Sequence, residues 1–136
     1  MASIFTRIIN GEIPCYKIAE DDLYFAFLDI NPVTRGHTLV IPKQETDNIF
    51  DLDDELLGGL HVFAKKVAHA IDKAIPCERV TMAVVGLEVP HAHIHLVPLD
   101  QMGDMNFSKN RPEFSDHEMK ITANKIFQSF RHLNRD

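Results

Sequence analysis

The sequence predicts an α+β fold in which an antiparallel sheet packs against one long helix. Two patterns predict it: short β-branched and aromatic runs end at proline or glycine, and one long segment has apolar residues at helical spacing. The length is the third observation, because 136 residues with 45% hydrophobic content suffice for one core and are short for two. We therefore expect a single domain over residues 1–136.

Four runs have the composition of strands. The first is rich in aromatic residues and ends before Pro32, and the second is β-branched and ends at Pro42. A short turn around Gly86 separates the last two. The expected strands are residues 24–30, 37–42, 79–85 and 91–99.

Two segments have the periodicity of helices. From Asp53 to Ile75 the apolar residues recur at helical spacing, after an acidic start and before Pro76. The second helix opens with the capping-box sequence of residues 115–118 and runs to about Asn134. We expect its apolar stripe to cover the core or a subunit contact.

Charge and composition exclude several function classes. A net charge of -6 argues against a broad surface for DNA or RNA, although a small anionic ligand in a local pocket is allowed. The chain has no apolar run near the length of a membrane span and no signal-peptide pattern, so we expect a cytoplasmic protein that does not bind membranes. Cys15 and Cys77 have no metal-like spacing and are expected to be reduced thiols.

The stretch VPHAHIHLVP, residues 89–98, carries histidines at every second position. In a regular strand His91, His93 and His95 would form a row about 13 Å long on one face. Zinc bonds of about 2.0–2.1 Å are too short to gather that row onto one ion. A phosphate ester suits it better, because one imidazole can attack phosphorus while others donate hydrogen bonds. The alternative is a chance cluster of surface histidines, which the apolar residues between them disfavour.

The run HAHIHLV resembles the signature of the histidine triad (HIT) family. The upstream stretches IFTRIINGEIPCYKI and AFLDINPVTRGHTLVIPK also resemble this family, so the likeness covers about residues 3–100. The chain is similar to the histidine triad nucleotide-binding branch, whose members hydrolyse or transfer nucleotidyl groups through a covalent nucleotidyl-histidine. The resemblance implies a HIT-like fold with about five strands, a long central helix, a short N-terminal helix and, over residues 101–136, a C-terminal extension with a helix.

The resemblance also implies a role for each matching residue. His93 is the expected nucleophile toward the α-phosphorus of an adenylated or guanylated substrate, and His95 the expected donor to the phosphate oxygens. His91 and His37 are expected to line the site and help orient His93. Asp29 matches the acid that binds the ribose hydroxyls, although it could instead cap a turn. The expected walls around a purine base, each of which could instead be core, are Ile4, Phe5, Ile8, Phe27 and Ile30.

The chain departs from the family at two places. Some members hold zinc with a CxxC pair, a histidine after IPK and the first triad histidine, where this chain has Ser3, Thr6 and Glu45. We therefore expect no metal and no cofactor, and Glu45 is most simply a solvated surface acid. Glu88 stands where the family often has a serine near the leaving group. Its carboxylate would repel an acidic leaving group and accept an amine, or it is an exposed loop acid.

Three function classes remain open. The leading one is a hydrolase of purine nucleoside phosphoramidates, which cleaves a P–N bond. The second is a dinucleoside polyphosphate hydrolase or nucleotidyl transferase, which shares the covalent step and differs in the leaving group. The third is a non-enzymatic nucleotide-binding or partner-binding protein, which the retained histidines disfavour. The resemblance further implies a homodimer formed through a sheet edge and the central helix.

Overall fold

The computed structural model describes residues 2–108 and 110–134. The predicted α+β architecture is confirmed: these residues form a five-stranded antiparallel sheet of order β1-β2-β3-β5-β4 and three α-helices. The strands are β1 (Lys17–Glu20), β2 (Tyr24–Leu28), β3 (Thr38–Pro42), β4 (Arg79–Ala83) and β5 (Ile94–Leu99). The helices are α1 (Ile4–Ile9), α2 (Asp54–Ala74) and α3 (Asp116–Asn134), with short 3-10 turns η1 (Ile49–Asp51) and η2 (Met102–Asp104).

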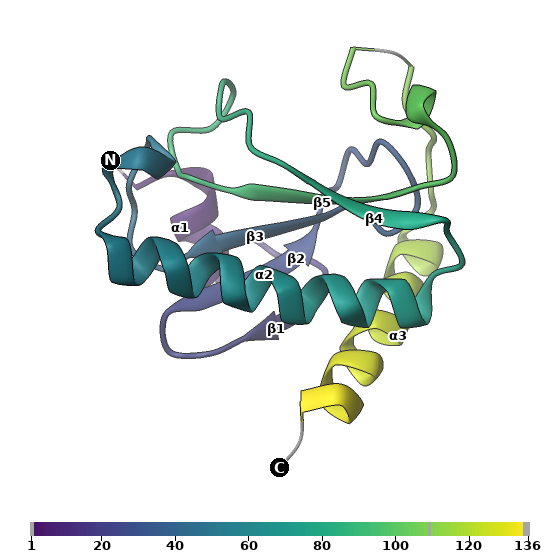
Figure 1. Ribbon diagram of the computed structural model, residues 1–136, viewed down its shortest axis with the longest axis horizontal. Coiled ribbons are helices and arrows are strands. Elements are labelled where there is room, and N and C mark those ends of the chain that lie inside the picture. Colours follow the sequence, from purple (N-terminus) through teal and green to yellow (C-terminus); the bar gives the residue numbers. More distant parts are fainter. Residues whose placement is uncertain (1, 109, 135–136) are drawn as a thin grey trace.

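Both faces of the central strands are covered, as the arrangement of α2 and α1 about the sheet shows (Figure 1). Along β2, Tyr24 and Ala26 belong to the core under α2, whereas Phe25 and Phe27 pack with α1 on the opposite face. Successive side chains of a strand point to opposite faces, so every residue of β2 is buried. The α1 face holds the smaller core and is the one beside the histidines.

The two long helices begin where their capping residues predict. The Asp53 carboxylate accepts the N–H of Leu56 at 2.8 Å at the start of α2, and the Ser115 hydroxyl accepts the N–H of Glu118 at 3.1 Å at the start of α3. Met119 and its apolar neighbours on α3 belong to the main core, and α3 packs against α2 and β1. The apolar stripe of the C-terminal helix therefore covers core, one of the two outcomes expected for it.

The last strand differs from its prediction at one end. The sequence predicts a strand over residues 91–99, but β5 begins only at Ile94. The reason is that the backbone before Ile94 bonds outside the sheet: the N–H of Ala92 donates to the Thr46 carbonyl at 2.7 Å, and that of His91 to the Val89 carbonyl at 2.8 Å. His91 and His93 therefore do not continue a regular strand, and a straight row of three imidazoles is wrong.

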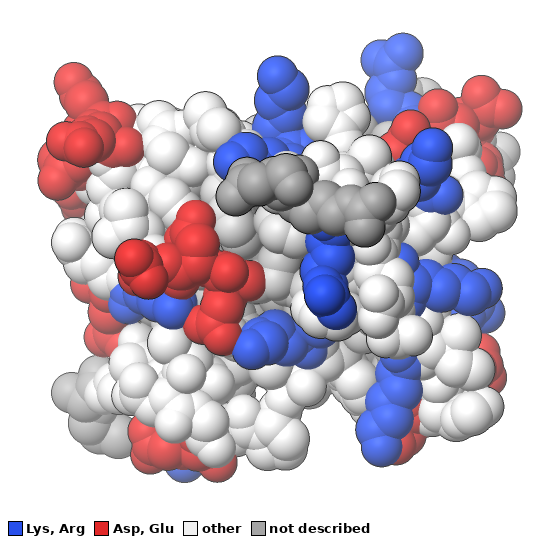
Figure 2. Space-filling model, turned by 90° about the horizontal axis from the view of Figure 1, so that it is seen from below, with Lys and Arg blue, Asp and Glu red and all other residues white. Residues whose placement is uncertain are grey.

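The surface carries charges of both signs. On the face drawn in Figure 2, Lys and Arg side chains are interspersed with Asp and Glu, so this face does not offer the uniform basic surface of a nucleic-acid-binding protein. Among the described residues, no helix has the length and apolar character needed to cross a bilayer. The single domain over residues 1–136 and the cytoplasmic location stay predictions.

Candidate active site

A cavity of about 520 Å³ opens on the α1 face of the sheet. Its walls come from α1, the end of β2, the chain between β4 and β5, β5 itself and the segment after η2. The cavity brings together these predicted site residues: Ile4, Phe5, Ile8, Phe27, Asp29, Ile30, Glu88, His93 and His95. A second cavity of about 610 Å³, between the chain before β1 and α3, has no histidine among its lining residues, so we place the chemistry in the first.

The apolar part of the cavity is partly rigid and partly open. Phe5 and Phe27 are buried and meet edge to face, with ring centroids 5.4 Å apart. Ile4 and Ile30 are exposed over 48% and 77% of their surface. A flat apolar ligand that entered here would cover side chains that otherwise face water, and such burial is favourable.

His93 is held by the main chain in one tautomer. Its Nδ1 lies 2.7 Å from the carbonyl oxygen of His91, and its ring meets that of Phe5 edge to face at 5.2 Å. A carbonyl oxygen only accepts, so Nδ1 is the donor. In a neutral ring the lone pair is then on Nε2, the nitrogen that a nucleophile must present.

His91 is buried behind the cavity wall. Its Nε2 donates to the Pro42 carbonyl at 2.8 Å, and its Nδ1 accepts from the Ser3 hydroxyl at the same distance. Burial lowers the pKa of His91, although the Pro42 carbonyl acts against this effect. His91 is not among the residues that line the cavity, so it differs from the expectation. It reaches the site through its carbonyl, which holds His93.

His37 and His95 form a hydrogen-bond relay with a fixed direction. The N–H of Val33 donates to Nδ1 of His37 at 3.0 Å, and Nε2 of His37 lies 2.9 Å from Nδ1 of His95. Since Nδ1 of a neutral His37 accepts, its Nε2 carries the proton and donates to His95, whose own proton is then on Nε2. Burial lowers the pKa of His37 to about 3 and that of His95 to about 4. Both rings are neutral near pH 7.

A glycine sets the position of His37. Gly36 has a φ of 90°, a conformation that side chains disfavour, and a Cβ at this position would lie 3.2 Å from Pro98. The turn therefore places His37 immediately before β3, the strand that pairs with β5. His37 is fully buried and, like His91, lies behind the cavity rather than in its lining.

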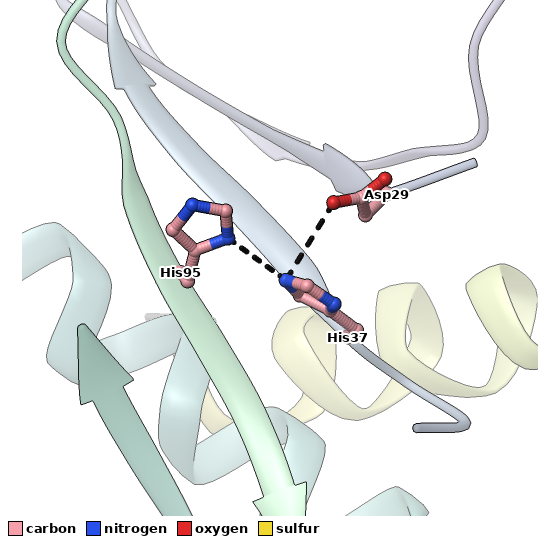
Figure 3. Close-up of side chains that lie close together, drawn as sticks. All are labelled: Asp29, His37 and His95. Carbon is pink, nitrogen blue, oxygen red and sulfur yellow. Dashed lines mark hydrogen bonds and ion pairs between the residues drawn. The ribbon is translucent and has the colours of Figure 1, made fainter. Parts of the chain in front are cut away.

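Asp29 completes the group and approaches the same ring nitrogen of His37 as His95 does (Figure 3). Its Oδ1 accepts the N–H of Asn31 at 2.8 Å, which is the turn-capping contact, and its Oδ2 lies 3.6 Å from Nε2 of His37. Burial raises the pKa of Asp29, partly offset by the Asn31 N–H and the positive charge of Arg111. Asp29 lines the cavity while it caps the turn, so the two expected roles are compatible in one conformation.

Asp29, His37 and His95 resemble a metal site in their spacing but not in their protonation. One potential ligand atom of each lies within 4.8 Å of the others. A metal ion needs a lone pair on each coordinating nitrogen. The Val33 N–H occupies Nδ1 of His37 and so leaves the proton on Nε2, the nitrogen that would have to bind the ion. The hydrogen bonds of His37 therefore do not fit a metal ligand.

The residues at the family's zinc positions form a hydrogen-bonded cluster. Oε1 of Glu45 accepts the main-chain N–H of Ser3 and the hydroxyl of Thr6, each at 2.6 Å. These hydrogen bonds, that of Thr6 foremost, lower the pKa of Glu45 to about 2. Glu45 is exposed, as expected of a surface acid, but it has a further role: it holds the start of α1, and through Ser3 it meets His91.

The comparison with known families matches this geometry. A model of the HIT domain matches residues 10–102. The chain belongs to the HIT domain family. An uncharacterised HIT-like protein of Borreliella burgdorferi is 36% identical over 134 residues, covering 89% of this chain and 96% of its own. A Schizosaccharomyces pombe protein named adenosine 5'-monophosphoramidase is 39% identical over 103 residues, 72% of this chain and 74% of its own.

A solved structure shares nearly the whole fold of this HIT protein. The histidine triad nucleotide-binding protein of Sulfolobus tokodaii, described as hypothetical, superimposes with a TM-score of 0.85 at 29% identity. The match covers 96% of this chain and 93% of that one. The family assignment and the HIT-like fold expected from the sequence are both confirmed.

This HIT protein has cavity residues that the sequence did not single out. Phe107, Ser108 and Arg111 line the cavity, and all three lie beyond residue 102, where the family match ends. Phe107 packs edge to face on His95 with ring centroids 4.9 Å apart. No local pattern marks these residues, because they reach the site only when the chain after β5 folds back over it.

Proposed function

We propose that the protein is a nucleotidyl hydrolase that cleaves the P–N bond of purine nucleoside phosphoramidates through a nucleotidyl-His93 intermediate. One observation carries the proposal: His93 lines the cavity while its Nδ1 is bonded to the His91 carbonyl, so that Nε2 bears the lone pair. A histidine that served only for packing would not need a fixed tautomer beside an open cavity.

The reaction follows in two balanced steps. In the first, the Nε2 lone pair of His93 forms a bond to the α-phosphorus, and the P–N bond to the leaving amine breaks. Its electron pair stays on the amine nitrogen, which takes up a proton from solvent. In the second, water attacks phosphorus and releases one proton to solvent, the P–Nε2 bond breaks, and the lone pair returns to His93 as the nucleoside monophosphate forms. Nε2–H of His95 donates to a phosphate oxygen as negative charge develops there.

The cavity offers a place for each part of a nucleotide. The apolar side chains, with Phe5 and Phe27 innermost, suit a purine ring. Asp29 suits the ribose hydroxyls, since a carboxylate accepts hydrogen bonds and this side chain lines the cavity. A phosphate attached to that ribose would then reach His93 and His95, whose ring centroids are 4.9 Å apart.

The named relatives support the same reaction class. The Schizosaccharomyces pombe relative is named an adenosine 5'-monophosphoramidase, and so is one from Saccharomyces cerevisiae at 37% identity over 102 residues. Glu88 lines the cavity and carries a negative charge, which favours an amine over an acidic leaving group.

A second candidate is hydrolysis of dinucleoside polyphosphates or nucleotidyl transfer. Arg111 favours it, because a guanidinium in the cavity lining suits substrates with additional phosphates. The deciding experiment compares adenosine 5'-phosphoramidate with diadenosine polyphosphate in one buffer with a chelator. Faster turnover of the phosphoramidate supports our proposal, and faster turnover of the dinucleotide supports the second candidate. Nucleotide binding without turnover of either would reject both in favour of a binding protein.

We also propose that the protein forms a homodimer through β4 and α2. β4 is an edge strand in the order β1-β2-β3-β5-β4, and exposed edges invite pairing with another strand. Exposed apolar side chains gather on β4 and the chain that follows it, and one lies on α2; they are Met82, Val84, Val85, Leu87 and Val62. Antiparallel pairing of β4 with its copy around a two-fold axis would cover them.

A further inference from the structure

Arg111 is the cation of the cavity. Among the described residues that line it, the charged side chains are the carboxylates of Asp29 and Glu88 and the guanidinium of Arg111. The chain that carries Arg111 loops beyond the end of β5 before it enters α3 (Figure 1). Arg111 also lies outside residues 10–102, so it belongs to the part of this chain that the family model does not match.

The guanidinium is held in place on the cavity side. One η nitrogen donates to the Asn31 carbonyl at 2.6 Å and the other to the Phe107 carbonyl at 2.9 Å. The group also lies 5.6 Å from the centroid of the Phe107 ring, which packs on His95. Each η nitrogen carries two N–H groups, so both carbonyl bonds are compatible with further donation to a ligand. Arg111 is thus ordered before any ligand binds, which reduces the entropy lost on binding.

An anionic ligand in this cavity would need a nearby positive charge. His37 and His95 are neutral near pH 7 because burial lowers their pKa values, and they add no positive charge. Without Arg111, the carboxyl groups of Asp29 and Glu88 would be the remaining acidic or basic side chains, apart from the histidines, among the described residues that line the cavity. The positive charge of Arg111 already acts on Asp29, His37 and His95, the residues beside the place proposed for the phosphate.

We infer that Arg111 is a specificity-determining residue that binds the phosphate oxygens of the ligand and selects nucleotides over uncharged nucleosides. The inference rests on the proposed nucleotide site and adds to it a contact from outside the matched family region. A guanidinium pairs with phosphate through parallel N–H···O bonds, whereas an ammonium is a single point charge. The affinity that Arg111 adds should therefore grow with ligand charge, from nucleoside to monophosphate to diphosphate.

The test is a calorimetric titration of adenosine, AMP and ADP into wild type and three variants. Arg111→Met keeps much of the side-chain length and removes the charge. It should weaken the affinity for AMP about 10-fold and that for ADP more, as expected for a lost charged hydrogen bond. The affinity for adenosine should change less than about twofold. Arg111→Lys should lie between wild type and Arg111→Met for AMP and ADP. Arg7→Met removes the same charge from α1 outside the cavity lining and should bind all three ligands like wild type.

Two outcomes would overturn the inference. In the first, Arg111→Met binds AMP as tightly as wild type does. In the second, its affinities for adenosine and AMP fall by the same factor, which indicates only a structural role for the segment. Arg111→Lys keeps the test decisive if Arg111→Met unfolds: it replaces the bidentate guanidinium by a point charge, so it should weaken the affinity for AMP more than that for adenosine relative to wild type, and equal factors for both ligands would overturn the inference. Failure of the proposed function looks different: wild type would then leave adenosine 5'-phosphoramidate intact, whatever Arg111→Met does to nucleotide binding.

Discussion

Nδ1 of His93 and the main-chain carbonyl of His91 lie 2.7 Å apart, and this contact selects the protonation state of the proposed nucleophile. The selecting group comes from the residue two positions earlier in the same triad. The spacing of two therefore serves a purpose other than the expected row on one face of a strand, because it lets the backbone of one histidine fix the ring of the next.

The first prediction concerns His93 itself. His93→Ala should lower kcat by several orders of magnitude, because the side chain that forms the covalent intermediate is gone, while AMP binding survives through Asp29 and the apolar wall. Rapid acid-free quenching of wild type with labelled substrate, followed by mass spectrometry, should locate the nucleotide on His93.

His69→Ala serves as the control for that experiment, since His69 is an exposed histidine of α2 outside the cavity lining. It should retain wild-type turnover. Label on any other residue, or near-normal turnover by His93→Ala, would show that the nucleophile is misassigned.

The second prediction concerns the relay. His95→Ala should reduce the rate of the covalent step by about 10²–10³, the usual effect of losing a donor to a developing oxyanion. His37→Leu should reduce it less, because it removes only the N–H that fixes the tautomer of His95. The double variant should be no slower than His95→Ala, since His37 acts through His95. Additive losses in single-turnover kinetics would mean that the two rings act separately.

The third prediction concerns metals. The protein should purify without stoichiometric zinc and keep its activity in a chelator, because Ser3, Thr6 and Glu45 bond to one another and to His91 where thiolates and an imidazole would be needed. The triple variant Ser3→Cys, Thr6→Cys, Glu45→His should bind about one zinc per chain by elemental analysis, as its two thiolates, the new imidazole and His91 make a four-ligand set that suits zinc. One tightly bound zinc in wild type, lost together with activity, contradicts this prediction.

The fourth prediction is a pH dependence of stability. The pKa values of His37 and His95, about 3 and about 4, lie below the ordinary 6.5, so the unfolded chain binds these protons first as pH falls. The contribution of these two neutral rings to the free energy of unfolding is complete above pH 6.5. It is lost as pH falls toward 4, by up to about 1.4 kcal/mol per pH unit for each ring. The pKa of Asp29 is raised, so its effect on the free energy of unfolding has the opposite sign and falls nearer the pH range in which carboxyl groups titrate.

Urea unfolding at pH 7.5, 6.5 and 5.5 measures this dependence. His37→Gln removes one titrating ring, while its amide can still accept the Val33 N–H, and should flatten the decline. An equal decline in wild type and His37→Gln would mean that His37 does not titrate as described.

The fifth prediction concerns assembly. Sedimentation at micromolar concentration should give a dimer for wild type and a monomer for Met82→Lys, which places a charge on the exposed apolar edge strand. Leu23→Lys is the matched control, because Leu23 is similarly exposed but lies beside β1 and β2 at the other end of the sheet. A monomeric wild type would reject the interface.

The strengths and failures of the sequence predictions have physical causes. The stretch Tyr24–Leu28 was recognisable because aromatic residues fill both faces of a covered strand, and α2 because its acidic cap and Pro76 bound a clear period. β1 has only four residues with charges at both ends, too little pattern to delimit it. The family resemblance pointed to nine of the twenty residues that line the cavity, including Asp29 and His93.

Other features depend on contacts between distant parts of the chain. Arg111 reaches the cavity through the carbonyl of Asn31, which lies 80 positions earlier. β5 starts late because Ala92 bonds to Thr46, again far along the chain. The role of Glu45 likewise depends on the place where α1 docks. Periodicity reports only local geometry, so none of these contacts was visible in it.

The groups that select the tautomers of His91, His93 and His37 are the carbonyls of Pro42 and His91 and the N–H of Val33, and all three are main-chain groups. A substitution changes a side chain and leaves peptide groups in place, provided that the fold persists. Substitutions in the walls that contact base and leaving group can therefore alter which substrate is accepted without disturbing the reactive state of His93. They can arise by mutational drift or by deliberate redesign. Such separation makes the scaffold a good starting point for evolving new leaving-group preferences.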